Sequence, residues 1–270
     1  MKKAKEKKIR PILYFINSNK ILIITATIAT TFWIVPKRIT NYTLPTYKDK
    51  NSFEIIQEPR RLKEDEINIA TSYGFKTAKM MMDKGDHKFK PEVMIDNLGN
   101  KMYKYKLKEG EQAKSPKQIE EHAIKTKKKI AMHRETIKLL LKELRDIGVT
   151  VAIGNPRKLG AAAVWSPKTQ TIKISPAKME QGSLAVLRVI NHEAIHVAQS
   201  CKNGGVNYRV APIGVDISPR KIYHTQMNSK IYSNASRDIK KAEKEAYSYE
   251  YSSQSAIYFI NKYCKGNEKS

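Results

Sequence analysis

"RVINHEAIHVAQSC", residues 188–201, carries two histidines four positions apart and a glutamate directly after the first. Residues i and i+4 of an α-helix lie on one face, so His192 and His196 are expected to project together. That spacing lets two imidazole nitrogens converge on one tetrahedral metal ion at about 2 Å. Glu193 would lie about 100° around the helix, which suits a general base better than a third ligand. The stretch therefore predicts a metal-binding helix.

The side chains around the histidines strengthen this prediction. The neighbouring residues are uncharged, in a chain whose charged residues make up 29% of the total: Val189, Ile190, Ala194, Ile195, Val197 and Ala198. A helix that is apolar around most of its girth is expected to be buried, and burying two histidines and a glutamate without partners is costly. A bound cation removes that cost. The alternative is a chance motif whose histidines are ordinary core residues.

The H-E-x-x-H motif and its uncharged surroundings resemble those of the zincin metallopeptidases. The metzincin branch needs Gly and His where this chain has Gln199 and Lys202. The gluzincin branch takes its third ligand from a glutamate on a later helix. "KAEKEAYSYE" (241–250) is similar to the E-x-x-A-[DN] element of several gluzincin families, with Glu243 and Ala246 matching and Tyr247 departing. The resemblance implies an α+β, zincin-like domain that is a gluzincin-like zinc peptidase.

The resemblance also implies roles for particular residues. Zinc would be held by His192, His196 and Glu243, with Glu245 as the alternative third ligand. A zinc-bound water would occupy the fourth position, and Glu193 would take its proton and return it to the leaving amine of a peptide or protein substrate.

Two further parts of the site follow from the same resemblance. His224, Tyr247 and Tyr208 are the candidates for stabilising the transition state. The strand expected at "TIKIS" (171–175) resembles the zincin edge strand that aligns an extended peptide.

The rest of the chain predicts the elements around this helix. Apolar periodicity predicts one long helix or two stacked helices between Ser115 and Gly148, and Ser183 is expected to cap the histidine helix. Short strands are expected at 149–155 and on both sides of 166–168, a hairpin around 97–100, a helix ending before Gly85, and helices at 218–232 and 236–264. These elements predict an α+β domain over 112–265, after a helical or irregular region at 61–111.

The N-terminus predicts a membrane anchor. A basic segment (1–19) precedes an uncharged apolar run within 20–36, and a proline-punctuated tether follows at 37–60. The run is short for a membrane span, and the alternative is a cleaved signal peptide. The basic segment favours a single-pass protein of the cell membrane, with its N-terminus in the cytoplasm and its catalytic domain outside.

The chain has a formal charge of +25. Because lysine greatly outnumbers arginine, no specific nucleic-acid partner is expected. Two other functions stay open: a basic polyanion-binding surface protein, and a membrane-tethered, zincin-fold binding protein that is catalytically silent.

The chain has two cysteines, Cys201 and Cys264. In a domain outside the cytoplasm they are expected to form one disulfide that closes a loop of about sixty residues. The alternative is two unrelated buried thiols.

Overall fold

The computed structural model describes residues 62–88, 90–106, 110–158, 160–217, 223, 232 and 235–266, and the backbone of a strand at 12–16. The fold is α+β, as the sequence predicts. Two compact units are formed by residues 1–52 with 89–129 and by residues 53–88 with 130–270. Within the described residues, no helix is both long and apolar enough to cross a membrane. The predicted anchor at 20–36 lies outside them.

The first unit contains an antiparallel sheet with the strand order β1-β4-β3. Its strands are β1 (Ile12–Ile16), β3 (Glu92–Ile95) and β4 (Lys101–Lys106). The predicted hairpin around 97–100 is confirmed, because Asp96 Oδ1 accepts hydrogen bonds from the backbone N–H groups of Leu98 and Asn100. An aspartate that bonds its own turn in this way fixes the loop between two strands.

The second unit contains a four-stranded sheet with the order β2-β5-β7-β6. Its strands are β2 (Ile67–Asn68), β5 (Thr150–Ile153), β6 (Ala163–Ser166) and β7 (Thr171–Ile174). The β5–β7 pair is parallel and the other pairs are antiparallel. The "TIKIS" segment, expected to be the edge strand, is instead the interior strand β7. Its two sides are taken by β5 and β6, so β6 forms the edge.

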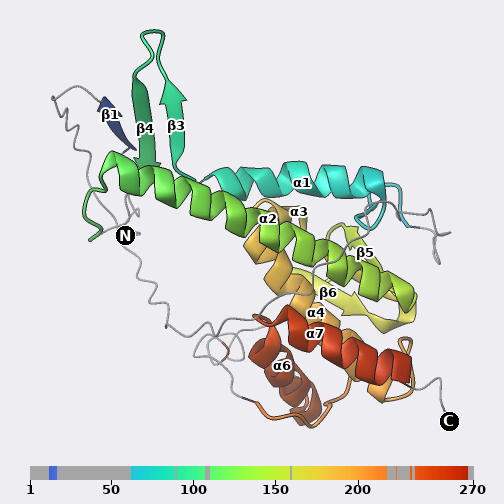
Figure 1. Cartoon of the computed structure of the whole chain (residues 1–270). Coiled ribbons are helices and arrows are strands. Elements are labelled where there is room, and N and C mark those ends of the chain that lie inside the picture. Colours follow the sequence, from blue (N-terminus) through green and yellow to red (C-terminus); the bar gives the residue numbers. More distant parts are fainter. Residues whose placement is uncertain are drawn as a thin grey trace, which may run out of the picture. The chain divides into compact units, whose positions relative to one another are not determined.

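Helices make up most of the described chain (Figure 1). They are α1 (Ser72–His87), α2 (Pro116–Asp146), α3 (Pro176–Met179), α4 (Ser183–Lys202), α6 (Arg237–Tyr249) and α7 (Ser253–Ile260), and a π-helical turn follows at Asn261–Lys265. The single helix expected at 236–264 is two helices. Ser252 interrupts it, because its side chain accepts a hydrogen bond from Ser255 N and caps α7.

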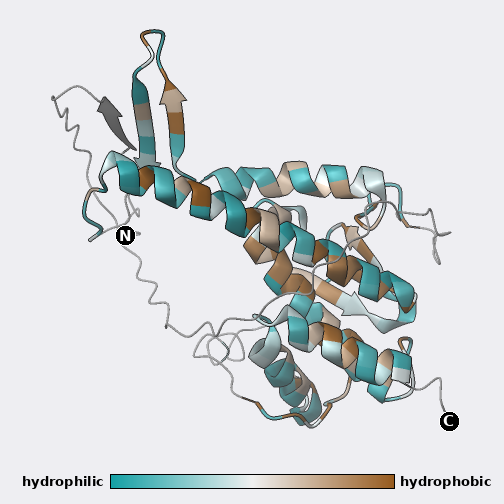
Figure 2. Cartoon of the chain, in the orientation of Figure 1, coloured by the Kyte–Doolittle hydropathy of each residue, from teal (hydrophilic) through white to brown (hydrophobic). Residues whose placement is uncertain are grey.

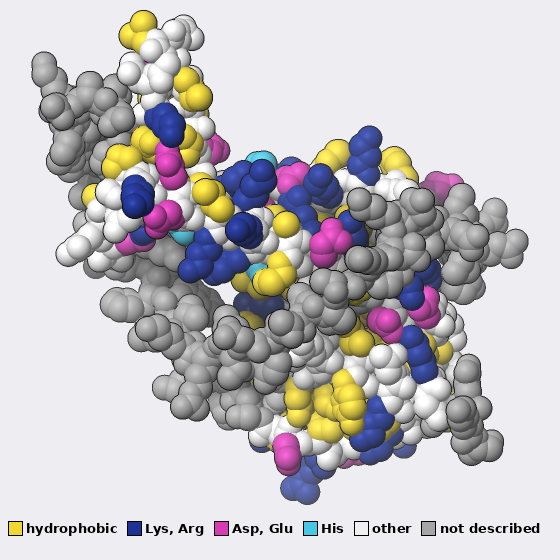
Figure 3. Space-filling model, viewed as in Figure 1, with side chains coloured by type: hydrophobic (Ala, Val, Ile, Leu, Met, Phe, Trp, Pro, Cys, Tyr) yellow, Lys and Arg dark blue, Asp and Glu magenta, His cyan; other side chains and the backbone are white. Residues whose placement is uncertain are grey.

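The helix α4 lies in the core of the second unit. It contacts β6, β7, α1, α3, α6 and α7, and hydrophobic residues dominate much of its length (Figure 2). Every residue from Ile190 to Cys201 is buried. The uncharged surroundings of the histidines therefore predicted burial correctly. On the face drawn in Figure 3, basic side chains are interspersed with acidic and hydrophobic ones, and the densest basic group lies over α2.

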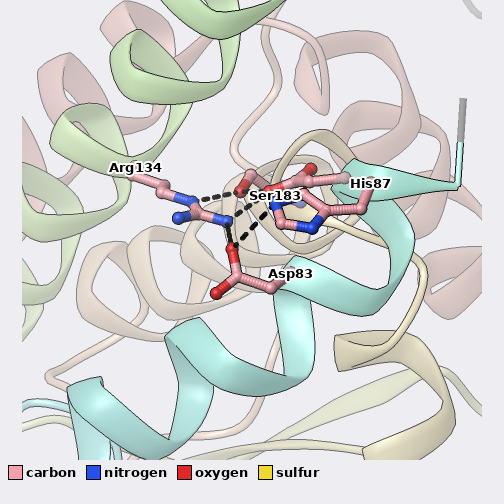
Figure 4. Close-up of polar contacts among 5 residues, drawn as sticks. Asp83, His87, Arg134 and Ser183 are labelled. Carbon is pink, nitrogen blue, oxygen red and sulfur yellow. Dashed lines mark hydrogen bonds and ion pairs between the residues drawn. The ribbon is translucent and has the colours of Figure 1, made fainter. Parts of the chain in front are cut away.

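The start of α4 is held by residues from α1 and α2 (Figure 4). Ser183 was expected to cap the helix but is its first residue, and Gly182 holds the cap position. Asp86 provides the cap instead, because its Oδ1 accepts the Ser183 N–H at 2.8 Å. Arg134 bonds Asp83 at 2.5 Å and Asp86 at 2.7 Å through Nη2, and donates from Nε to Ser183 Oγ. This network fixes where the histidine-bearing helix begins.

Gly85 does not end α1, as the sequence suggested, but lies inside it. A Cβ on this residue would lie 2.2 Å from the carbonyl carbon of Gln181. The glycine is therefore required by the close approach of α1 to the segment before α4, and the helix continues to His87.

Candidate metal centre

The structure brings together the three residues that the sequence predicts as ligands. His192 and His196 lie on α4 and Glu243 lies on α6. Glu243 Oε2 is 3.3 Å from His192 Nε2 and 3.5 Å from His196 Nε2. One ligand atom from each of the three residues lies within 4.8 Å of the others. The site is therefore a buried cluster of two nitrogens and one oxygen.

A hydrogen-bond chain fixes the orientation of His196. Gln199 Nε2 donates to the carbonyl oxygen of Ala242 at 2.9 Å and to Glu245 Oε2 at 2.8 Å. Its Oε1 must then be the acceptor in the 2.7 Å contact with His196 Nδ1. In the neutral imidazole this places the proton on Nδ1 and a lone pair on Nε2. That lone pair faces the Glu243 carboxylate, an arrangement that calls for a cation between them.

The charges in the cluster favour the same conclusion. Burial acts to lower the pKa of His196, but the Glu243 carboxylate outweighs it and raises this pKa to about 9. Burial acts to raise the pKa of Glu243, but His196 and His192 hold it well below its usual range. Glu243 Oε2 is buried and makes no hydrogen bond of good geometry. Either a proton or a metal ion stabilises this group, and two imidazoles with one carboxylate fit zinc.

Glu193 lies beside the cluster without belonging to it. The residue is 5% exposed, and its Oε2 accepts a hydrogen bond from the backbone N–H of Trp165 at 2.7 Å. The Trp165 indole donates to Ser200 Oγ at 3.0 Å. Trp165 therefore joins the edge strand β6 to α4 at two points, and one of them holds the Glu193 carboxylate in place.

Glu245, the alternative third ligand, is not among the three residues whose ligand atoms converge. Its Oε2 accepts from Ile213 N at 2.7 Å as well as from Gln199, and its Oε1 accepts from Gly214 N at 2.7 Å. The residue is fully buried. Its carboxylate thus anchors the loop after α4 and orients Gln199, while Glu243, about half a turn away on α6, faces the histidines.

The tyrosines expected near the site differ in their placement. The Tyr247 ring lies 4.5 Å from the His192 ring and lines the cavity over the site. Tyr208 is 52% exposed and does not line this cavity. His224 lies outside the described residues. Tyr232, which the sequence did not single out, also lines the cavity. Burial, with the Glu243 charge second, raises the pKa values of Tyr232 and Tyr247.

A cavity of about 470 Å³ opens over the cluster. It is lined by β6 and the residues before it, by part of α4, and by the cluster-facing side of α6. Both Glu193 and the three clustered side chains line it. A molecule in the cavity would therefore contact the cluster and the edge strand together.

The two cysteines meet at the ends of their helices. Cys201 lies at the end of α4 and Cys264 lies in the turn after α7, and their Cα atoms are 5.0 Å apart with the sulfur atoms at bonding distance. The loop that this pair closes contains α6 and Glu243. The contact thus links the two parts of the chain on either side of Glu243.

Three residues of the site had not been predicted: Trp165, Gln199 and Tyr232. Gln199 could have been found, because it lies three residues after His196 and hence on the same helix face. The contacts of Trp165 with α4 and of Tyr232 with the cavity join segments far apart in the sequence, and no local pattern marks them.

A family model described as "Domain of unknown function (DUF8637)" matches residues 168–265. The match spans β7 to α7 and includes both histidines, Glu193, Glu243 and both cysteines. No curated protein matches the chain, and no solved structure matches it. The three clustered side chains and Glu193 thus lie in a segment similar to a family that is described without a function, whereas β6 and Trp165 precede the matched residues.

Proposed function

We propose that the protein is a zinc-dependent metallopeptidase of the zincin type, most similar to the gluzincins. The observation that carries this proposal is the convergence of two imidazole Nε2 atoms on one buried carboxylate oxygen, beside Glu193 and a cavity. The order of elements supports it: a long helix, a small sheet with a free edge next to the cavity, the histidine helix, and a later helix with the third ligand.

Each side chain of the site has a separate proposed role in peptide hydrolysis. A zinc ion held by His192, His196 and Glu243 supplies Lewis acidity toward water and toward a carbonyl oxygen. Glu193 accepts a proton from the attacking water and delivers it to the leaving nitrogen. The Trp165 N–H fixes one oxygen of the Glu193 carboxylate, so the other is the oxygen that exchanges protons.

Tyr247 is the proposed donor to the developing oxyanion. Burial raises its pKa, so the phenol keeps its proton at neutral pH and can donate a hydrogen bond. His224 stays a second candidate from the sequence.

The edge strand β6 is proposed to align the substrate. Ala163, Val164 and Trp165 line the cavity, and among the strands that the structure describes β6 has a neighbour in the sheet on one side only. An extended peptide would add to this edge through main-chain hydrogen bonds, which bring its backbone past Glu193. Recognition through main-chain hydrogen bonds depends little on the side chains of the substrate.

The cellular setting is part of the proposal. A membrane anchor at 20–36 would put the catalytic domain outside the cytoplasm, with peptides or proteins as substrates. It would also separate residues 12–16 from β4, with which they pair in the structure. The approach of Cys201 to Cys264 supports this setting, because disulfides persist in oxidising compartments.

The variant Glu193→Gln tests the proposal. The full-length protein is incubated with a mixture of peptides, and mass spectrometry detects the products while elemental analysis measures zinc in the same samples. Glu193→Gln should keep its zinc and lose hydrolysis, because it removes a base and no ligand. Glu121→Gln, the same change at an exposed position, is the control and should keep both. Hydrolysis that survives Glu193→Gln, or zinc that is lost with it, would contradict the assignment.

A further inference from the structure

The cavity has a basic wall beyond the metal cluster. Lys158, Lys178 and Arg188 line it, and the only acidic lining residue outside the cluster and Glu193 is Glu250, among the residues that the structure describes. Glu250 Oε1 lies 2.8 Å from Arg188 Nη2, so it is already paired. The two lysines leave this wall with an excess of positive charge.

Arg188 is held in a fixed position. It lies one turn before His192 on α4, and hence on the same face of that helix. Glu250 binds one edge of its guanidinium, and its Cζ lies 4.0 Å from the centre of the Tyr251 ring. A guanidinium fixed by an ion pair and by stacking loses little freedom when it binds a further anion.

Lys178 lies on α3, and neighbouring carboxylates neutralise its charge less than they neutralise that of Arg188. Its Nζ donates to Gln181 Oε1 at 3.1 Å, which is an uncharged partner. Burial lowers the pKa of Lys178, and the nearby Arg188 charge lowers it further. Two cations that repel one another at a partly buried wall are stabilised when an anion lies between them.

We propose that this wall binds a carboxylate of the substrate, so that the enzyme prefers peptides with a negative charge close to the scissile bond. The inference rests on the proposed peptidase function and names its substrate class. The Cα atoms of Arg188 and His192 are about 6 Å apart along α4, and an extended residue spans about 3.3 Å. The charge is therefore expected about two residues from the carbonyl that is attacked. An acidic side chain or the C-terminal carboxylate of a short peptide can supply it.

The binding of peptides to the full-length, zinc-loaded Glu193→Gln protein tests whether the basic wall selects a carboxylate, because this variant is expected not to hydrolyse them. Four fluorescent peptides of one sequence carry Glu or Gln at the variable position, each with a free or an amidated C-terminus. The Glu peptides should bind on the order of tenfold tighter than the Gln peptides if a side chain occupies the wall. The free C-terminus should give the same advantage if the terminal carboxylate occupies it.

Variants locate the effect. Lys178→Met should reduce the preference for the charged peptide to about twofold, and Arg188→Gln should do the same. Because Arg188→Gln leaves Glu250 unpaired and can reduce stability, Lys178→Met is the decisive variant. Lys168→Met removes the same charge at an exposed position outside the cavity and should leave the preference unchanged.

Equal affinity for all four peptides, or a preference that survives Lys178→Met, would overturn the inference. Failure of the proposed function gives a different result. In that case the wild-type protein cleaves none of the peptides or holds no zinc, while the binding assay still reports whether the wall selects a carboxylate.

Discussion

Replacement of Gln199 by Leu removes the residue that orients His196 while leaving every proposed ligand in place. The change keeps the approximate side-chain volume and deletes the acceptor for His196 Nδ1 and two donated hydrogen bonds. Glu245 keeps its contacts with Ile213 and Gly214, so the loop after α4 stays anchored. The variant therefore removes the partner of His196 Nδ1 together with the two bonds that Gln199 makes to α6.

The expected effect has two parts. Loss of an outer partner of a metal-bound histidine lowers metal affinity by about 10- to 100-fold, or about 1.4 to 2.7 kcal/mol. In the metal-free protein the buried His196 Nδ1 loses its partner, which lowers the free energy of unfolding by about 1 to 3 kcal/mol.

Zinc affinity is measured by competition with a chromophoric chelator, and stability by urea unfolding after chelation. Gln254→Leu, the same change at an exposed position on α7, is the control and should alter neither quantity. Unchanged zinc affinity in Gln199→Leu would refute the argument that Gln199 presents the Nε2 lone pair of His196 to a metal.

Three further predictions concern the cluster and the bridge, and one concerns topology. Glu243→Gln should lose zinc. Glu245→Gln should keep zinc but lose about 1 to 3 kcal/mol of stability, because the new amide N–H groups would face backbone N–H groups. If Glu245→Gln loses zinc and Glu243→Gln keeps it, Glu245 is the third ligand. Replacing Cys201 and Cys264 by Ala should lower stability by about 4 kcal/mol and Tm by about 10 °C, given a separation of 63 residues, and two thiols that alkylate freely before reduction would exclude the bridge. The pKa of His196 is raised from 6.5 to about 9 in the folded protein, so its stabilising contribution is complete below pH 6.5 and is lost as pH rises toward 9; a flat stability profile of the metal-free protein across that window would contradict this. Protease added to intact spheroplasts should remove the domain if the predicted anchor crosses the membrane. Protection of the domain would contradict this topology and would leave residues 12–16 and β4 on the same side of the membrane, as their pairing requires.

Patterns local in the sequence predicted the fold well. Apolar periodicity predicted α2 and α4, and alternation with turn residues predicted the β3–β4 hairpin and the β6–β7 pair. Spacing alone placed the two histidines on one face. Such features depend on neighbours a few residues apart, which is why they can be read from one sequence.

Features that depend on distant segments were predicted less well. Gly85 reads locally as a helix end, but it is explained by contact with Gln181, which is 96 positions away. The edge position of β6 depends on the pairing of β5 with β7. The choice between Glu243 and Glu245 depends on which side of α6 packs on α4, and both residues fit the helical pattern equally well.

Metal analysis of the purified full-length protein tests the central claim most directly. We expect about one zinc per chain, with X-ray absorption showing two imidazole nitrogens and oxygen at about 2.0 to 2.2 Å. His192→Ala and His196→Ala should each lose this zinc. A protein that holds no zinc when it is supplied, or a His192→Ala variant that holds it as tightly as the wild type, would contradict the account.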